Sequence, residues 1–308
     1  MQRDSTMVSS EAADPGAEIL TRIEASTVET APFDHIYVEG VFSPTTYRRL
    51  LESLPETRRY REFHHRDAMQ PDGHSARRKF YLYPEHLLFL PAGQRAAWRG
   101  VSRALLSRRL QAAFKRTFRC ALERRFGRGV DRLSFYPIPI LLRDLPGYGI
   151  GVHGDSLGKA ITVQFYLPGD DSQAHLGTIL HGGRDDSSGA DGRKLAFRPA
   201  TAYAFPVLRH ESWHSVAHTR DTDGERNSLM LTYYVQDGLL AWLGHRLAGL
   251  GVPGLRPAPL TGPVPVPARS FSEHDQAPGL DDARASRSRA RRSPAGPAEP
   301  SPPALRPV

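Results

Sequence analysis

The sequence predicts a mainly β core with flanking α-helices, and three observations support this. Apolar runs rich in β-branched and aromatic residues follow one another through the second half of the chain, as strands do. A long helical stripe of apolar residues precedes them. The length of 308 residues and the hydrophobic content of 39% suit one domain with extensions better than two catalytic domains.

The first part of the chain is expected to be a lead followed by a supporting region. Residues 1–30 are polar, lack the basic start and apolar core of a secretion signal, and predict a mostly disordered lead. Residues 31–130 predict a helical support, which opens with a short strand at Phe33–Val38. Ser43 and Pro44 then fit the N-cap and first turn of a helix.

Two further segments complete this support. The charged stretch 56–79 predicts a mobile loop over the site. From 96 to 126 a helical apolar stripe is expected, at Val101, Leu105, Leu110, Phe114, Thr117 and Ala121. Gly127 and Gly129 end it. Cys120, the single cysteine, lies in this helical pattern, excludes an intrachain disulfide and suits a reducing cytoplasm.

The core is expected at residues 131–236. Its strands are predicted at Ile161–Leu167, Thr201–Pro206, from Trp213 onward, and at Ser228–Val235. A short helix and a Pro/Gly-rich segment are expected at 237–268. The Pro-, Ser- and Arg-rich tail, 269–308, is too poor in apolar residues to bury a core and is expected to be disordered.

A His-x-Asp motif at the edge of this core predicts metal ligands. His153 and Asp155 lie two positions apart, so an extended strand would send both side chains to one side. The buried strand that follows would place them at a strand end. A second copy, His65 and Asp67, lies in a polar stretch without a strand pattern and is interpreted as surface or loop.

A distal histidine would complete the ligand set, and the sequence offers three candidates: His210, His214 and His218. Their spacing of four would share one helix face, but the flanking residues predict a strand, a turn and another strand. Residues 210–214 do have the order His-Glu-x-x-His, but zinc proteases carry it on a helix, which the flanking residues do not predict. His214, in the context His-Ser-Val, is the preferred ligand.

An arginine and a serine follow at the start of the last strand. Arg226 and Ser228 would share one face of that strand. A guanidinium offers a fork of donors matched to a carboxylate, and the hydroxyl adds another donor. The pair therefore predicts an anchor for a carboxylate.

Together these motifs resemble the Fe(II)/2-oxoglutarate-dependent oxygenase superfamily, nearest to its prolyl-4-hydroxylase-like branch, over roughly residues 133–236. The resemblance implies a double-stranded β-helix (jelly-roll or cupin-like) core. It implies His153, Asp155 and His214 as catalytic iron ligands that leave one metal face open. It also implies that Arg226, Ser228 and Tyr166 hold the far carboxylate of 2-oxoglutarate, while O2 takes the last metal position.

The sequence also departs from the family pattern. Asp144 stands nine residues before the first ligand, where prolyl hydroxylases commonly carry a tyrosine, so a peptidyl-proline substrate is less favoured. Asp155 is retained where related halogenating enzymes have glycine or alanine, which favours hydroxylation. The alternatives are a non-catalytic metal-binding or interaction module on the same barrel, and a zinc hydrolase.

The substrate is the least defined part of the prediction. It could be a small molecule, a carrier-bound group or a peptide, with Thr162, Gln164 and Tyr148 as candidate lining residues. The net charge of +8, much of it on the helical region 95–128 and the tail, fits either an arginine-rich solvated surface or a docking surface for an anionic substrate or carrier. No nucleic-acid-binding signature and no apolar run of membrane-spanning length is present, and the oligomeric state stays open.

Overall fold

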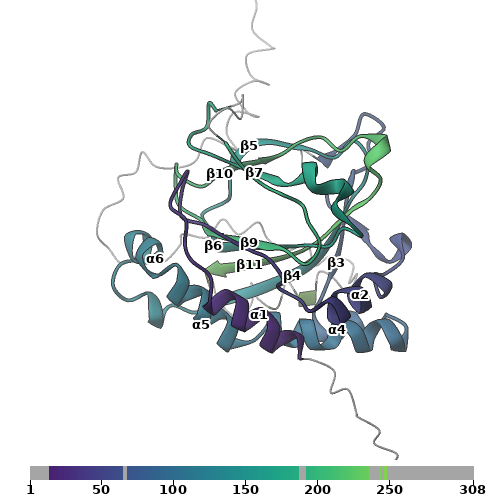
Figure 1. The fold of residues 1–308 in the computed structure, drawn as a ribbon, viewed down its shortest axis with the longest axis horizontal. Coiled ribbons are helices and arrows are strands. Elements are labelled where there is room, and N and C mark those ends of the chain that lie inside the picture. The colour runs from purple at the N-terminus through teal and green to yellow at the C-terminus, as the bar shows by residue number, and fades with distance from the viewer. Residues whose placement is uncertain (1–13, 65–67, 187–191, 236–242, 244–245, 248–308) are drawn as a thin grey trace, which may run out of the picture. The chain divides into compact units, whose positions relative to one another are not determined.

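The structure, a computed structural model, describes residues 14–64, 68–186, 192–235, 243 and 246–247. Two antiparallel sheets face one another, and a layer of helices covers the outer side of the larger one (Figure 1). In order across the larger sheet, the strands are β1 (Ile36–Val38), β9 (Ala202–Pro206), β6 (Lys159–Tyr166), β11 (Arg226–Val235), β4 (Phe135–Asp144), β3 (Arg77–Tyr81) and β2 (Arg61–Glu62).

The smaller sheet orders β5 (Ile150–Gly154), β10 (Trp213–Val216), β7 (Thr178–His181) and β8 (Arg193–Leu195). Short 3-10 turns connect the strands and helices at η1 (Thr57–Arg59), η3 (Val130–Arg132), η4 (Asp171–Leu176) and η5 (Asp221–Asp223). This two-sheet arrangement is that of a double-stranded β-helix, so the predicted fold class is confirmed.

Strand β11 shows how the sequence sorts side chains between the two faces of the larger sheet. It pairs along its whole length with β4, from Arg226 opposite Asp144 to Val235 opposite Phe135. Because side chains alternate along a strand, the odd-numbered residues from Leu229 to Val235 pack into the core under the helices, while Arg226 and the even-numbered residues point between the sheets. The inner face is therefore free to carry the polar site.

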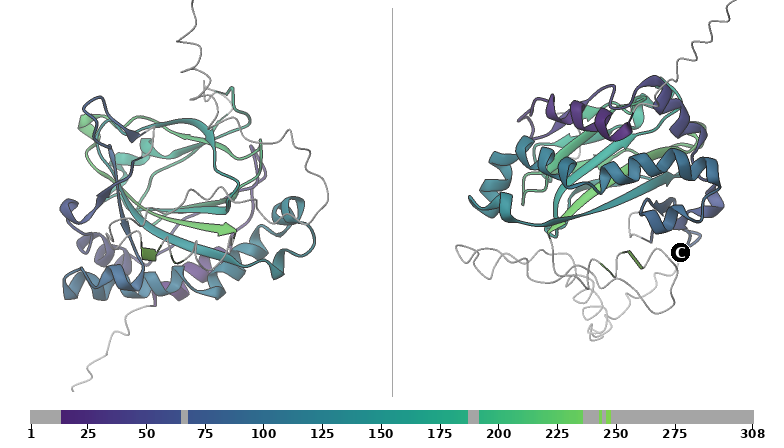
Figure 2. Two further views of the ribbon diagram at one scale, coloured as in Figure 1. Left: turned by 180° about the vertical axis from the view of Figure 1, so that it is seen from behind. Right: turned by 90° about the horizontal axis from the view of Figure 1, so that it is seen from below.

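The helices lie side by side across the outer face of the larger sheet (Figure 2). Their bounds are α1 (Pro15–Glu24), α2 (Pro44–Glu52), α3 (Pro84–Leu87), α4 (Ala92–Leu105), α5 (Arg108–Thr117) and α6 (Arg119–Phe126). The expected N-cap of α2 is confirmed, since the Ser43 hydroxyl accepts a hydrogen bond from the Thr46 amide at 3.3 Å. None of the helices in the described residues is long and apolar enough to cross a membrane.

Two sequence-based expectations about helices are corrected. The expected disordered lead, 1–30, is wrong for Pro15–Glu24, which form α1 and bury Ile19, Leu20 and Ile23 in the core. The Asp14 side chain caps this helix, and Pro15 fits its first turn.

The single helix expected at 96–126 is instead α4, α5 and α6. The Ser107 hydroxyl accepts from the Leu110 amide at 3.2 Å and starts a new helix, and Phe118 separates the last two. Gly127 ends α6 at φ 79°, a conformation that suits glycine.

The charged stretch 56–79, expected as a mobile loop, contains regular secondary structure in its described residues. Its residues include η1, β2 and the start of β3, which pairs with β4 along Arg77–Tyr81. This pairing brings Arg77 to the inner face of the larger sheet, opposite Asp144. Most of the segment expected at 237–268 and all of the tail at 269–308 lie outside the described residues, as does the second motif at His65 and Asp67.

Candidate metal centre and its cavity

Strands β5 and β10 bring the two preferred histidines face to face. His153 and His214 are direct partners in the antiparallel register, and their ring centroids lie 4.2 Å apart. Asp155 follows β5 immediately. Each of the three residues offers one ligand atom, and these atoms lie within 4.8 Å of one another. The predicted ligand set is thus assembled by two neighbouring strands.

Backbone carbonyl groups orient both imidazoles. His153 donates from Nδ1 to the Gly151 carbonyl at 2.9 Å, and His214 donates from Nδ1 to the Ser212 carbonyl at 3.2 Å. A carbonyl oxygen can only accept, so the ring hydrogen is on Nδ1 and the Nε2 lone pair is free. This tautomer leaves Nε2 available to a metal ion, and the hydrogen bond fixes the ring orientation.

The carboxylate of Asp155 is held from two sides. Thr162 donates from its hydroxyl to Oδ2 at 2.6 Å, and the Lys159 ammonium forms an ion pair with Oδ1. Burial alone raises the pKa of Asp155, but the charges of Lys159 and the two histidines outweigh it and hold that pKa well below its usual range. Asp155 is therefore an anion at neutral pH, as a metal ligand must be.

Burial has the opposite consequence for the histidine at the centre. Burial, followed by the charge of the neighbouring His153, lowers the pKa of His214 to about 4. The side chain is only 7% exposed. His214 is consequently neutral at physiological pH, with its lone pair available.

A cavity of about 330 Å³ opens beside these three residues. Thr162, Gln164 and Tyr148 line it, which confirms that the three residues suggested as lining do face one pocket. Two cations line it as well, Lys159 from β6 and Arg77 from β3. The cavity therefore has a mixed apolar and polar lining with the ligand cluster in its wall, and each of its two cations is paired with a carboxylate, Lys159 with Asp155 and Arg77 with Asp144.

The predicted carboxylate anchor, Arg226, lies behind this wall. It is fully buried and donates from Nη1 to Asp144 Oδ2 at 2.7 Å and from Nε to the Leu176 carbonyl at 3.1 Å. Arg77 binds the same carboxylate with two donors, at 2.6 and 2.9 Å. Two arginines thus share Asp144, which leaves one unbalanced positive charge in this group.

A chain of polar side chains connects the other two predicted anchor residues. Gln164 donates to the Ser228 hydroxyl at 2.7 Å, and Tyr203 donates to Gln164 at 2.8 Å. The Tyr166 hydroxyl accepts from the Thr178 amide at 2.9 Å. Ser228 and Tyr166 are partners in the pairing of β11 with β6, so they lie on adjacent strands next to Arg226.

The remaining histidine candidates take no part in the cluster. His210 and His218 are both exposed, and neither belongs to a metal-competent group within the described residues. His218 instead contacts the Gly147 carbonyl at 3.3 Å. The choice of His214 among the three therefore agrees with the observed clustering.

Sequence reasoning missed two residues of the cavity. Lys159 is four positions after Asp155, a local signal that could have suggested their ion pair. Arg77 carries no such signal, because it reaches the site only through the pairing of β3 with β4. It packs over the ring of Tyr148, with the guanidinium carbon 3.9 Å from the ring centroid.

Comparison with known proteins gives only distant structural likenesses. No family model matches the sequence, and no curated protein does either. Among solved structures, a Trichoplax adhaerens prolyl hydroxylase in complex with a hypoxia inducible factor peptide fragment is 12% identical, with a TM-score of 0.46 over 71% of this chain and 89% of that one.

Two others are similarly distant. A Pseudomonas putida prolyl-4-hydroxylase is 14% identical, with a TM-score of 0.43 over 73% of this chain and 100% of its own. HygX from Streptomyces hygroscopicus, with nickel, 2-oxoglutarate and hygromycin B bound, is 14% identical. Its TM-score is 0.42 over 66% of this chain and 83% of its own. Likenesses this weak assign neither an activity nor a substrate to this chain.

Proposed function

We propose that the protein is a non-haem Fe(II)/2-oxoglutarate-dependent dioxygenase that hydroxylates an unactivated C–H bond of a small-molecule, carrier-bound or peptide substrate. The observation that carries the proposal is the cluster of His153, Asp155 and His214 in a cavity wall, with both Nε2 atoms and a carboxylate available. Two imidazoles and one carboxylate on one side of a metal ion leave its other side open. The single cysteine, Cys120, suits the reducing, cytoplasmic setting that we expect for such an enzyme.

The donor set fits Fe(II), with imidazole and carboxylate ligands of the hardness that this ion accepts. When bound, Fe(II), 2-oxoglutarate and O2 supply the oxidation itself, in which 2-oxoglutarate becomes succinate and CO2 and one oxygen atom enters the substrate C–H bond. The protein's own part is placement. Thr162 orients the Asp155 carboxylate, and the carbonyl groups of Gly151 and Ser212 orient the imidazoles.

Arg226 is proposed to hold the far carboxylate of 2-oxoglutarate. Its Nη2 is a buried donor without an acceptor among the described residues, and such an unsatisfied donor favours a carboxylate ligand. Ser228 accepts from Gln164, which leaves its hydroxyl hydrogen free to donate to the same ligand. The Tyr166 hydroxyl donates to the Leu195 carbonyl at 3.4 Å, and it would have to give up this hydrogen bond to donate to the 2-oxoglutarate carboxylate.

The decisive measurement is anaerobic titration of the protein with Fe(II) and 2-oxoglutarate. Binding is monitored through the weak visible charge-transfer band of the chelate. We expect the band in wild type and its loss in His153→Ala and His214→Ala. In Arg226→Lys it should require more 2-oxoglutarate, because a lysine keeps the charge but loses the fork of donors. His218→Ala is the matched control, since this exposed histidine is outside the cluster.

The second candidate is the non-catalytic module, which the Lys159–Asp155 ion pair favours because an ammonium already occupies one oxygen of the carboxylate. Absence of the band in folded wild type that binds Fe(II) would contradict the dioxygenase and support this module. Decarboxylation of 2-oxoglutarate in the presence of Fe(II) and O2 would exclude it. Hydrolysis that needs zinc and ignores O2 would instead identify a zinc hydrolase.

A further inference from the structure

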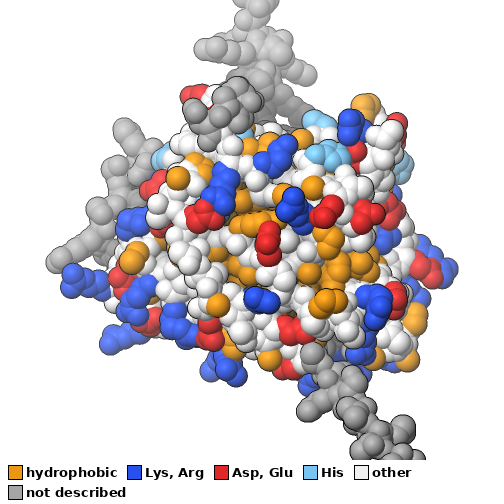
Figure 3. Space-filling view, in the orientation of Figure 1, with side chains coloured by type: hydrophobic (Ala, Val, Ile, Leu, Met, Phe, Trp, Pro, Cys, Tyr) orange, Lys and Arg blue, Asp and Glu red, His pale blue; other side chains and the backbone are white. Residues whose placement is uncertain are grey.

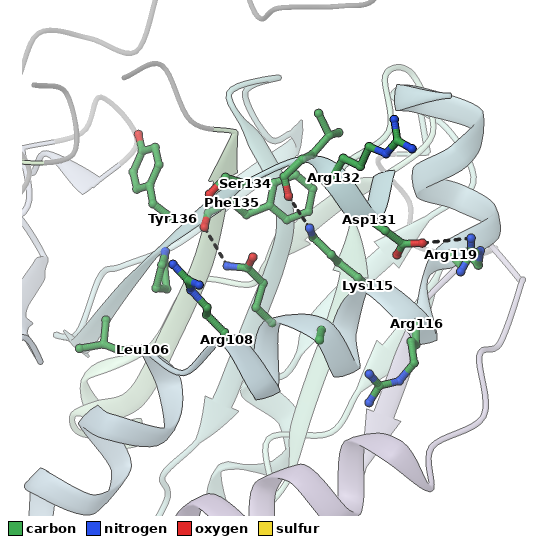
Figure 4. Close-up of a pocket in the computed structure, with 14 residues that line it drawn as sticks. Leu106, Arg108, Lys115, Arg116, Arg119, Asp131, Arg132, Ser134, Phe135 and Tyr136 are labelled. Carbon is green, nitrogen blue, oxygen red and sulfur yellow. Dashed lines mark hydrogen bonds and ion pairs between the residues drawn. The ribbon is translucent and has the colours of Figure 1, made fainter. Parts of the chain in front are cut away.

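A second cavity, of about 920 Å³, lies between α5 and the start of β4. Figure 4 shows the side chains that border it, most of which come from these two elements and from η3, with Leu106 from the end of α4 and Arg119 from α6. Five of them are basic: Arg108, Lys115, Arg116, Arg119 and Arg132. The only acidic residue among the described lining residues is Asp131. We refer to this cavity as the basic groove.

Part of this charge is neutralised and part is not. Arg119 pairs with Asp131 at 3.1 Å and with Glu123 at 2.9 Å, and Arg116 pairs with Glu24 at 2.6 Å. The guanidinium groups of Arg108 and Arg132 have neither a hydrogen bond nor an ion pair within the part of the chain that the structure describes. Two guanidinium groups of the groove are therefore available to a ligand.

Lys115 adds a buried cation to the groove. Its side chain is 7% exposed, and its ammonium donates to the Leu133 carbonyl and lies 4.7 Å from the centroid of the Phe135 ring. Burial lowers the pKa of Lys115, and Asp131 raises it only in part. A buried ammonium without a paired carboxylate is costly, and an anionic ligand beside it would offset that cost.

The basic groove borders the helix-covered side of the larger sheet and the metal cavity lies on its other side, but one pair of stacked rings connects the two. Tyr136 lines the groove and stacks on Tyr234, which lines the metal cavity, with ring centroids 5.5 Å apart. In the sheet Tyr136 pairs with Tyr234, and Tyr234 pairs with Lys159, the partner of Asp155. Since the backbones of adjacent strands are about 4.8 Å apart, the backbones of Tyr136 and Lys159 are about 10 Å apart across the sheet.

We propose that the basic groove binds the phosphate group of a phosphorylated small-molecule substrate, whose oxidised carbon reaches the metal cavity past Tyr136 and Tyr234. The proposal rests on the function proposed above and adds the substrate class. A phosphate dianion has three oxygen acceptors and suits several separate cationic donors better than a single carboxylate does. The groove volume also lies within the range of small-molecule sites.

The first test is titration of the metal-free protein with phenyl phosphate at low salt, with the binding measured by calorimetry. We expect saturable binding, weakened about tenfold or more in Arg108→Ser and in Arg132→Ser, because each variant loses a charge-assisted contact. Arg99→Ser is the matched control, since Arg99 is an exposed arginine on α4 outside the groove. Equal binding by all four proteins, or none at millimolar phenyl phosphate, would overturn the proposal.

The second test measures where the phosphate binds relative to the metal. With Mn(II) bound at His153, Asp155 and His214, paramagnetic relaxation of the phenyl phosphate 31P signal should give a distance of about 10–20 Å, as expected for a group roughly two strands or more away. Direct coordination to Mn(II), or no relaxation effect, would contradict the placement.

The two proposals can fail separately. Phosphate binding in the metal-free protein does not depend on Fe(II), 2-oxoglutarate or turnover, so its absence overturns the anchor and leaves the metal centre intact. Conversely, specific phosphate binding in a protein that gives no charge-transfer band would overturn the dioxygenase and, with it, the assignment of the phosphate to an oxidised substrate.

Discussion

Arg226 and Asp144 form an ion pair of 2.7 Å in which neither side chain is exposed to solvent. Arg77 completes the group from the neighbouring strand and is 14% exposed on the cavity side. Asp144 stands at the position where the sequence lacks the tyrosine common in prolyl hydroxylases. Here this departure has a structural consequence, because the aspartate gives the proposed anchor arginine a permanent partner within the protein.

Asp144→Asn should destabilise the protein by about 3 kcal/mol, because removing one partner leaves buried guanidinium charge uncompensated. Urea unfolding measures the free energy change. The control is Asp131→Asn, whose partner Arg119 lies at the surface, so the expected loss is below about 1 kcal/mol. Equal losses in the two variants would show that the buried group does not stabilise the fold.

2-Oxoglutarate should stabilise the Asp144→Asn variant more than it stabilises wild type. Without the Asp144 carboxylate, Arg226 and Arg77 lack their shared acceptor, and a ligand carboxylate can take its place. We expect 2-oxoglutarate to raise the Tm of Asp144→Asn by more than it raises that of wild type. An equal shift in both proteins would argue against Arg226 as the anchor.

Lys159→Met should strengthen binding of a divalent cation by about tenfold, because the Lys159 ammonium competes with the metal for Asp155 and repels it. Mn(II) binding followed by electron paramagnetic resonance measures this directly. Lys194→Met, at an exposed lysine of β8, should leave the affinity unchanged. Weaker binding in Lys159→Met would mean that the lysine supports the site rather than competing for it.

The buried His86 should make the free energy of unfolding depend on pH. It lies beside the rings of Tyr81 and Tyr83, at centroid distances of 5.5 and 5.7 Å, and neither ring nitrogen has a hydrogen-bond partner in the described structure. Burial lowers the pKa of His86 from 6.5 to about 4. Between these values the unfolded chain takes up a proton that the folded protein refuses, so stability is full above pH 6.5 and falls toward pH 4.

His86→Phe should therefore reduce the loss of stability between pH 7 and pH 5, by a slope of up to about 1.4 kcal/mol per pH unit. Urea unfolding at several pH values measures it. Part of the slope will remain, because burial also lowers the pKa of His35 and of His214. His64→Phe, at an exposed histidine, is the comparison variant, and an unchanged slope in His86→Phe would contradict the assignment.

Gly177 lies at a backbone contact that excludes any side chain. A Cβ atom there would lie 1.8 Å from the Leu195 carbonyl oxygen, so β7 and the end of β8 would have to move apart. Gly177→Ala should cost about 2 kcal/mol or more in the free energy of unfolding. Gly182→Ala, where no atom lies within 4 Å of the added Cβ, should change it by less than about 0.5 kcal/mol.

The local features of this protein follow from its sequence. The alternation of a strand places His153 and Asp155 together, and Trp213–Val216 forms the strand that was expected for His214. These predictions succeed because strand periodicity and turn residues act over a few positions. Even the missed helix α1 carries local signals, since Asp14 and Pro15 precede an apolar trio. The polar residues around them weaken this signal.

The tertiary structure alone decided what surrounds the motifs. Arg77, Asp144 and Arg226 meet because β3, β4 and β11 pair in a particular register, over sequence separations of 67 and 82 residues. The same pairing sets Tyr136 beside Tyr234 and so brings the basic groove near the metal cavity. A register between distant strands depends on the packing of whole faces, and a slip by one residue would turn every one of these side chains to the other face of the sheet.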